Sequence, residues 1–476
     1  MTESAAAKLD RLSTGNAEID EILAGGFPAN TINIIMGQPG TGKSILVESL
    51  IFRNAGKDRP ILYLTTMAEP MAKVVRYLQM FSFYDETKIG REIIFDDLGP
   101  HLAERGPGVV LTHIEDAIKK LSPKIIVIDS FKAIHDLGGP ESQMRPLLYE
   151  LAGLLTSYES TAFLIGEYTE QHAREYPEFG IADGIVQVKR SDLTTRDERF
   201  LRVLKLRGSQ YMEGLHAFEI TPDGLKVYPR LVSPTISPSY ESSKKRVSTG
   251  VPGLDQAVGG GLWEGSSTLL VGPAGSGKTT VAMQFALAGV KRGEDILYVH
   301  FQENPVQFAS RFQAIIATSR LPKGFHLLYK SPVELQIDSV IVEIFRRIKA
   351  GNVRRVVIDS VADLGMAASD PQRLHNYLYA LTQHLAVAKV TSYLTFETAQ
   401  QHIGAVLDPE GRFSYMSDNI ILLGMAAAQT IRRTVAIVKA RGTSHDLAVN
   451  ELEITERGAR VVKLSTPKTA HRNKKK

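Results

Sequence analysis

The sequence contains no cysteine, so disulfide bonds, zinc–thiolate sites and thiol catalysis are excluded. It has no run of 18 apolar residues, and a membrane-spanning helix is therefore not expected. Its first residues, MTESAAAKLDRL, lack the apolar stretch of a secretory signal peptide. Together these absences favour a cytoplasmic protein.

The chain also has little net charge outside its C-terminal end. The formal net charge is +4, and residues 466–476 hold five Lys or Arg and no acid, so subtracting them leaves −1. We expect a basic disordered tail, either simply solvated or in contact with an acidic partner or nucleic acid. The near-neutral remainder disfavours a long nucleic-acid channel, and we expect neither a nucleic-acid nor a membrane partner.

The chain of 476 residues repeats itself. Five blocks recur in the same order at offsets of 230 to 235 residues. The pairs are STG at 13–15 and 248–250, GQPGTGKS at 37–44 and GPAGSGKT at 272–279, ILYLT at 61–65 and ILYVH at 296–300, IIVIDS at 125–130 and RVVIDS at 355–360, and VLKLRGS at 203–209 and IVKARGT at 437–443. The chain is therefore two copies of one domain.

The Pro- and Ser-rich stretch Pro229–Arg246 separates the copies. We predict a first domain at 1–235, a linker at 236–246, a second domain at 247–465 and the tail at 466–476. Apolar runs alternate with helical patterns, which predicts an α/β fold with a mostly parallel, helix-covered sheet in each copy. In the first copy the expected strands are 31–36, 61–65, 124–128 and 162–166, and the expected helix is 44–54.

Both copies carry the phosphate-loop pattern G-x-x-x-x-G-K-[ST] between a predicted strand and a predicted helix. In that context backbone N–H groups cradle phosphate oxygens, the lysine reaches the outer phosphates and the hydroxyl ligates Mg²⁺. The predicted ATP-binding residues are Gly37, Gln38, Pro39, Gly40, Thr41, Gly42, Lys43, Ser44 and Ile45 in the first copy, and Gly272, Pro273, Ala274, Gly275, Ser276, Gly277, Lys278, Thr279 and Thr280 in the second.

Asp129 and Asp359 each end a run of β-branched residues. Such an aspartate holds Mg²⁺ when a phosphate loop precedes it, although alone it is often a helix cap. We therefore expect Mg²⁺ at Ser44 and Asp129 in the first copy, and at Thr279 and Asp359 in the second.

In combination these motifs, together with the STG entry segment and the late K-x-R-G strand, resemble the KaiC family. The resemblance covers roughly residues 10 to 465. It implies two RecA-like P-loop NTPase domains, ATP hydrolysis, and a homo-oligomer, expected to be a hexamer, with ATP between subunits and an unidentified regulatory partner.

KaiC-type domains place two adjacent glutamates after the second strand, and one of them activates water and approaches Mg²⁺. In the second copy these positions are Gln302 and Glu303, so one carboxylate is kept. In the first copy they are Met67 and Ala68, and Glu69 comes one residue late. We therefore expect the first domain to bind ATP tightly but hydrolyse it slowly. The alternative is that Glu69 or Glu167 supplies the carboxylate. Glu167 and Glu397 follow the next strand, where RecA-like folds sense the γ-phosphate.

The resemblance also implies residues that contact the ATP of a neighbouring subunit, chiefly through Lys and Arg side chains. These residues are Lys205, Leu206 and Arg207 in the first copy, Lys439, Ala440 and Arg441 in the second, and the upstream Arg199 and Arg433. A solvated strand face with long basic side chains is the alternative.

Ser414 falls on a serine that is phosphorylated in clock KaiC, whereas Tyr415 replaces the neighbouring threonine. A serine autokinase is therefore one hypothesis within an ATP-driven regulator. The competing functions are a nucleic-acid motor, which DNA-stimulated ATPase activity would favour, and a nucleotide-gated scaffold with little turnover.

Overall fold

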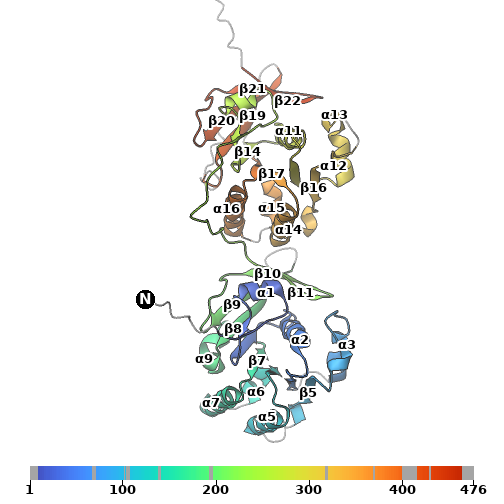
Figure 1. Ribbon diagram of the computed structural model, residues 1–476, viewed down its shortest axis with the longest axis vertical. Helices are drawn as coiled ribbons and strands as arrows, with labels where there is room; N and C mark the ends of the chain where they lie inside the picture. The colour runs from blue at the N-terminus through green and yellow to red at the C-terminus, as the bar shows by residue number, and fades with distance from the viewer. Residues whose placement is uncertain are drawn as a thin grey trace, which may run out of the picture. The chain divides into compact units, whose positions relative to one another are not determined.

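The computed structural model describes residues 9–463 except 67–70, 101, 103–107, 138–140, 192–196, 317–319, 368–369, 399–414 and 428–429. The chain divides into two compact units, Met1–Arg230 and Leu231–Lys476 (Figure 1). The residues after Arg230 pack on the second unit, where His384 contacts the Val232 carbonyl and the Tyr240 hydroxyl donates to the Ala386 carbonyl.

The first unit is built on a nine-stranded sheet in the order β11-β10-β9-β8-β3-β7-β6-β4-β5. The strands from β8 to β5 run parallel, and β9 to β11 add an antiparallel extension. The strand bounds are β3 Ile32–Met36, β4 Ile61–Thr65, β5 Ile93–Asp97, β6 Ile125–Asp129, β7 Thr161–Gly166, β8 Gly184–Ser191, β9 Glu198–Leu206, β10 His216–Thr221 and β11 Gly224–Tyr228.

The second unit repeats this sheet in the order β16-β15-β17-β18-β14-β19-β20-β21-β22, again with three antiparallel strands at one edge. The bounds are β14 Ser267–Gly272, β15 Asp295–His300, β16 Phe325–Tyr329, β17 Val353–Asp359, β18 Thr391–Glu397, β19 Asn419–Ala427, β20 Ile431–Ala440, β21 Asn450–Thr455 and β22 Gly458–Val462. Each unit also has a small two-stranded antiparallel sheet: β1 Arg11–Leu12 with β2 Phe27–Pro28, and β12 Arg246–Val247 with β13 Leu262–Trp263.

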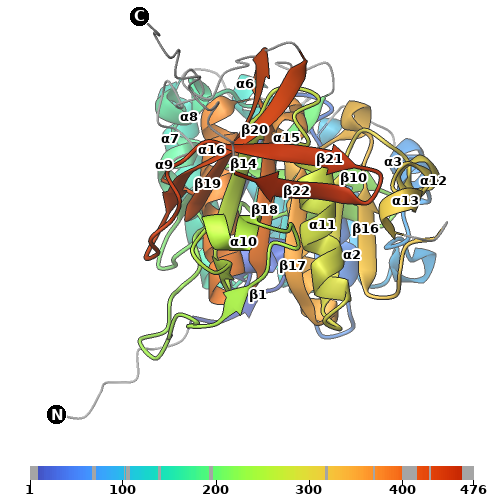
Figure 2. The same ribbon diagram turned by 90° about the horizontal axis from the view of Figure 1, so that it is seen from above.

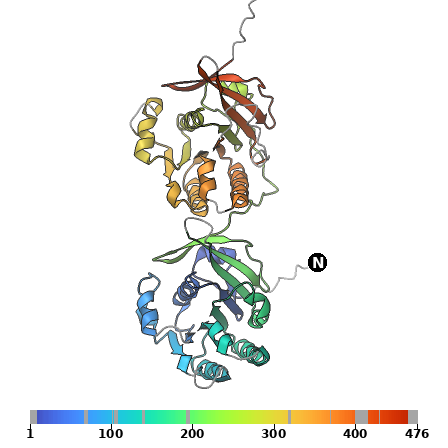
Figure 3. The ribbon, with the colours of Figure 1, turned by 180° about the vertical axis from the view of Figure 1, so that it is seen from behind.

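Helices cover both faces of each sheet (Figures 1 and 3). In the first unit they are α1 Ala17–Ile22, α2 Lys43–Asn54, α3 Met71–Leu78, α5 Gly108–Leu121, α6 Phe131–Leu137, α7 Glu141–Ser157, α8 His172–Glu175 and α9 Glu178–Ile181. In the second they are α10 Leu254–Ala257, α11 Lys278–Val290, α12 Pro305–Arg311, α13 Gln313–Ile316, α14 Ile337–Ala350, α15 Val361–Ala367 and α16 Pro371–Val387.

Because both faces are covered, alternate residues of one strand enter different cores. On β6, Val127 packs with α2 residues such as Leu50, whereas Ile126 packs with Ile118 of α5. The second unit has the same two layers, with α11 lying against β17 and β22 on one face (Figure 2). Strands buried on both sides explain the nearly unbroken apolar runs in the sequence.

The expected fold class is confirmed. The four expected strands and the expected helix occur, each within one residue of its predicted bounds. Among the described residues, no helix is long and apolar enough to span a membrane.

Two glycines place the phosphate loops against their helices. Gly42 and Gly277 precede α2 and α11 with φ of 104° and 103°, a left-handed backbone that favours glycine. A Cβ on Gly277 would also lie 2.5 Å from the terminal methyl group of Ile454, which would have to move. The loop can therefore turn tightly into the helix N-terminus.

Candidate functional site

The topology brings the predicted site residues of each domain to one edge of its sheet. The phosphate loop follows β3, Asp129 ends β6, and Glu167 follows β7, which lies between those two strands. In the second domain β14, β17 and β18 have the same relation. Parallel strands all end at the same edge, which is where open α/β sheets bind ligands.

Each loop lysine is buried and folded back onto its own loop. Lys43 and Lys278 are both 8% exposed, and Lys43 donates to the Gln38 carbonyl at 2.9 Å. Lys278 donates to the Gly272 and Pro273 carbonyls at 2.9 Å and lies 3.4 Å from the Glu397 carboxylate. The positive charge of each ammonium group is therefore only partly balanced by carbonyl oxygens and nearby carboxylates, so the group is placed to bind an anion.

The charges around the lysines follow the same pattern in both domains. Burial lowers the pKa of Lys43 from 10.5, and the negative charges of Glu167 and Asp129 oppose that shift. Burial also lowers the pKa of Lys278, and Glu397 opposes it. Glu167 and Glu397 therefore act on the lysines at the place where a terminal phosphate is expected.

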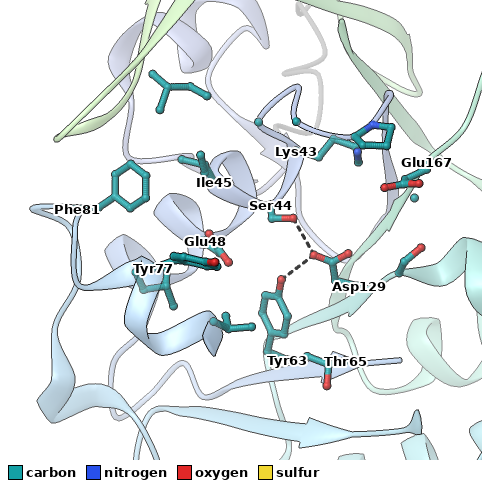
Figure 4. Close-up of a pocket in the computed structure, with 18 of the residues that line it drawn as sticks. Lys43, Ser44, Ile45, Glu48, Tyr63, Thr65, Tyr77, Phe81, Asp129 and Glu167 are labelled. Carbon is teal, nitrogen blue, oxygen red and sulfur yellow. Dashed lines mark hydrogen bonds between the residues drawn. The ribbon is translucent and has the colours of Figure 1, made fainter. Parts of the chain in front are cut away.

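In the first domain Asp129 joins the phosphate loop to the sheet (Figure 4). Its Oδ2 accepts hydrogen bonds from the Ser44 hydroxyl and the Tyr63 hydroxyl, both at 2.9 Å. Burial raises the pKa of Asp129 above its ordinary value of 3.8, while these two hydrogen bonds oppose the shift.

In the second domain Asp359 has a related but different set of partners. It is 5% exposed and accepts from the Tyr298 hydroxyl at 2.9 Å and the Thr395 hydroxyl at 2.6 Å. Sequence reasoning did not assign these supporting hydroxyls a role. The signal for the tyrosines was present, because Tyr63 and Tyr298 occupy matching positions of the repeat.

The first site fits Mg²⁺. A hydroxyl oxygen and a carboxylate oxygen 2.9 Å apart are suitable neighbours on one small cation, and Mg²⁺ commonly uses one or two protein oxygens together with substrate phosphates. No cluster of three or more His, Cys, Asp or Glu occurs among the described residues that could hold a metal without such phosphates. Ser44 and Asp129 would therefore hold Mg²⁺ jointly with the nucleotide.

A pocket of about 660 Å³ surrounds the first phosphate loop. Figure 4 shows Lys43, Asp129 and Glu167 at one side of it and the rings of Tyr77 and Phe81 at the other. A volume of this size suits a nucleotide-sized ligand. The pocket is thus polar where phosphates are expected and aromatic farther away.

Glu48 also lines this pocket, and sequence reasoning missed it. It lies on α2 one helical turn after Ser44 and is 8% exposed. The matching residue of the second domain is the fully buried Met283. The phosphate-loop helix therefore carries an acid beside the pocket in the first domain and no acid in the second.

The candidate water-activating residues of the second domain are engaged with other side chains. Glu303, 15% exposed, forms an ion pair with Arg311 of α12. The Gln302 amide lies 3.4 Å from the carboxylate of Asp363, which also accepts from the Ser360 hydroxyl at 2.6 Å. In the first domain, Met67, Ala68 and Glu69 lie outside the described residues.

The K-x-R residues lie at the opposite sheet edge from their own phosphate loop. Lys205 pairs with Ile185 near the start of β8, and Lys439 pairs with Ile420 near the start of β19. Ile185 is level with Ile34 and Ile420 with Leu269, so these cations lie roughly 7–10 Å before the points where the loops leave β3 and β14. Lys205 and Lys439 contact the Phe179 and Ser417 carbonyls, and neither Lys205 nor Arg207 lines the pocket around the first phosphate loop. Leu206 and Ala440, between the cations, pack into the apolar cores.

Arg433 behaves differently from this expectation. Its Nε donates to the Gly275 carbonyl of its own phosphate loop at 2.9 Å, because it lies at the far end of β20. In this chain Arg433 therefore contacts the phosphate loop of its own domain, and its contact with a neighbouring subunit's ATP stays a prediction. Arg199 lies at the corresponding end of β9, opposite Arg190.

The candidate phosphorylation site, Ser414, lies outside the described residues. Tyr415, the next residue, is described. Its ring is 4.9 Å from the His375 ring and 5.9 Å from the Tyr379 ring, both on α16.

The ATPase domain model of KaiC matches residues 12–232 and again 247–466. This chain belongs to the KaiC family. It is 26% identical to the circadian clock oscillator protein KaiC of Picosynechococcus sp. over 93% of this chain and 88% of that protein. It is 26% identical to the same-named protein of Rippkaea orientalis over 96% and 89%, and 25% identical to the circadian clock oscillator protein KaiC 1 of Synechocystis sp. over 92% and 86%.

The family assignment supports ATP binding and ATPase activity in this chain. The duplicated match agrees with the duplicated sheet, phosphate loop and terminal aspartate described above.

Acidification should weaken Mg²⁺-dependent ATP binding in the first domain at a pH above that expected for an ordinary aspartate. The carboxylate of Asp129 holds the metal only when charged, and burial raises its pKa. Below that pKa we expect Mg²⁺ affinity to fall about tenfold per pH unit. A fluorescent ATP analogue titrated into a Lys278→Ala chain measures this. An identical pH profile in a chain that also carries Asp129→Asn would contradict the assignment.

Proposed function

We propose that this chain is an ATP-hydrolysing oligomeric regulator that assembles into a homohexamer with Mg²⁺-bound ATP between neighbouring subunits. The observation that carries the proposal is the position of Lys205 and Arg207, and of Lys439 and Arg441, at the sheet edge away from their own phosphate loops. A second chain's nucleotide is the anion that such a cation pair suits in a ring of identical subunits.

The charges around these pairs are only partly compensated within the chain. Burial and then the positive charge of Arg207 lower the pKa of Lys205, and burial and Arg441 do the same to Lys439. Asp183 and Asp418 oppose these shifts and form ion pairs with Arg207 and Arg441, so two cations share one carboxylate in each domain. A phosphate from a neighbouring subunit would add negative charge there, and the cations would stabilise charge in the transition state for ATP hydrolysis.

Within the assembly we assign most turnover to the second domain. It keeps Glu303 at the water-activating position, and Lys278 and Asp359 complete the phosphate and metal site. The matching position in the first domain is Ala68, which cannot accept a proton. A general base contributes ~10²–10⁴-fold to rate, so its loss suits a domain that binds ATP and hydrolyses it slowly.

A serine autokinase is a narrower form of this proposal. Its support is the position of Ser414 in the sequence and the similarity to proteins named clock oscillators. Gln302 stands where a carboxylate would orient a hydroxyl nucleophile, and this argues for slow phosphoryl transfer to protein if it occurs.

Addition of Mg²⁺ and ATP should convert the protein from oligomers smaller than a hexamer to a hexamer. Static light scattering on the full chain with and without ATP measures the change in mass. Lys43→Ala should prevent assembly at the same ATP concentration, because it removes the cation that holds the first domain's phosphates. An unchanged mass on adding ATP to the parent chain would refute the proposal.

Lys278→Ala should remove most steady-state ATP turnover, at least about tenfold, because it disables the domain that keeps a water-activating carboxylate. Phosphate release from the assembled protein measures turnover. The control is ATP-dependent assembly of the same variant, which should persist through the first domain. Robust residual hydrolysis in the assembled variant would show that the first domain also turns over.

A further inference from the structure

A buried acid–base pair lies in the first domain outside the ATP pocket. The Nδ1 atom of His135 on α6 is 3.1 Å from the Oε2 atom of Glu178 on α9. Glu178 is completely buried, and among the described residues its second oxygen has no hydrogen-bond partner. A buried carboxylate is costly without a cationic or hydrogen-bonding partner, so this contact strongly constrains the two helices.

Aromatic rings fix the His135 side of the pair. The His135 ring stacks on the Tyr176 ring with centroids 3.9 Å apart and planes at 9°. The His172 ring also stacks on Tyr176, with centroids 4.6 Å apart. The buried Tyr168 lies beside Glu178, and its pKa is raised well above 10.0 first by burial and then by that negative charge. The phenol therefore stays neutral, and His135 is the side chain whose ring nitrogen contacts the Glu178 carboxylate.

The residues directly after Glu178 hold the two cations proposed to reach a neighbouring subunit. The Phe179 carbonyl lies 3.4 Å from the Lys205 ammonium, and the Gly180 carbonyl accepts from Arg207 at 3.5 Å. Arg207 also forms an ion pair with Asp183 at 3.3 Å. In this short segment the Glu178 side chain is buried in the core, whereas the backbone carbonyl groups of the next two residues contact Lys205 and Arg207.

This segment needs an anchor from outside itself. The helix α9 has only four residues, too few for a helix to be stable on its own. Its partner α6 begins at Phe131, two residues after the metal-binding Asp129. The His135–Glu178 contact therefore fastens the cation-bearing edge to the helix that leaves the nucleotide site.

We propose that Glu178, held by His135, is a positioning residue that fixes Lys205 and Arg207 for the ATP of the adjacent subunit. The inference rests on the proposed function, because it requires those cations to act between chains. It is specific to the first domain. In the second, Gly365 occupies the position of His135, and Lys439 is held instead by the Ser417 carbonyl at 2.7 Å.

The test compares full-length variants by the ATP concentration that gives half-maximal assembly in light scattering. Arg207→Ala should raise that concentration most, because it removes a cation outright. His135→Phe keeps a stacked ring but removes the nitrogen that contacts the buried Glu178 carboxylate, and should raise that concentration on the order of tenfold. Glu178→Gln should give a smaller rise. His172→Phe, in the same ring stack but without contact to Glu178, is the matched control and should behave as the parent.

Two further measurements separate positioning from general loss of structure. Binding of a fluorescent ATP analogue to unassembled chains should be unchanged in His135→Phe and Glu178→Gln, since neither residue lines the pocket. The double variant His135→Phe/Glu178→Gln should assemble more readily than His135→Phe alone, because it no longer leaves a buried carboxyl group without the contact from His135.

Parent-like assembly of both His135→Phe and Glu178→Gln, beside impaired Arg207→Ala, would overturn this inference and leave the proposed function intact. Parent-like assembly of Arg207→Ala would overturn the proposed function itself. Loss of nucleotide binding together with assembly, or no recovery in the double variant, would reduce the pair to a structural role and contradict positioning.

Discussion

The structure depends on a buried lysine ammonium held at the mouth of each phosphate loop. Lys43 and Lys278 donate hydrogen bonds mainly to carbonyl groups of their own loops. The acids near them are Asp129 and Glu167 in the first domain and Asp359 and Glu397 in the second. An ammonium group so placed is poorly solvated, and a polyphosphate supplies the negative charge that it lacks. The glycine-rich turns and the adjacent strand ends keep this cation beside the aspartate, Asp129 or Asp359, that is proposed to hold Mg²⁺.

The two domains share that arrangement but distribute their other acids differently. The first has Glu48 on the phosphate-loop helix and no acid at Met67 or Ala68, whereas the second has Met283 on the helix and Glu303 after the strand. In the second domain Glu303 contacts Arg311, so its availability as a base depends on how that ion pair changes when ATP and a neighbouring subunit bind. One fold can in this way provide a site for assembly and a site for turnover.

The sequence was sufficient to predict features that depend on local pattern. The strands and phosphate loops follow from apolar runs and glycine spacing, and Ser44 meets Asp129 because parallel strands end at one edge. Contacts that depend on side-chain direction could not be predicted. Arg433 contacts its own loop, and the ion pair of Glu303 with Arg311 depends on the rotamers of two flexible side chains.

Long-range pairs were also beyond sequence reasoning. His135 and Glu178 are 43 residues apart, and no motif marks either one. Their contact becomes visible only when α9 folds back beside α6. The hydroxyl of Thr395 on Asp359 is a similar case, because the matching residue of the first domain is the apolar Ile165.

The central claim is that the two nucleotide sites differ in ATP turnover. Measuring the nucleotide content of the assembled protein tests this claim most directly. Chains assembled with ATP, freed of excess nucleotide and then denatured, can be analysed for ATP and ADP per chain. The account predicts one nucleotide per domain, with ATP retained in the first and ADP accumulating in the second, so that Lys278→Ala removes the ADP and leaves the ATP. Recovery of ADP alone from both the parent and the Lys278→Ala protein would contradict it.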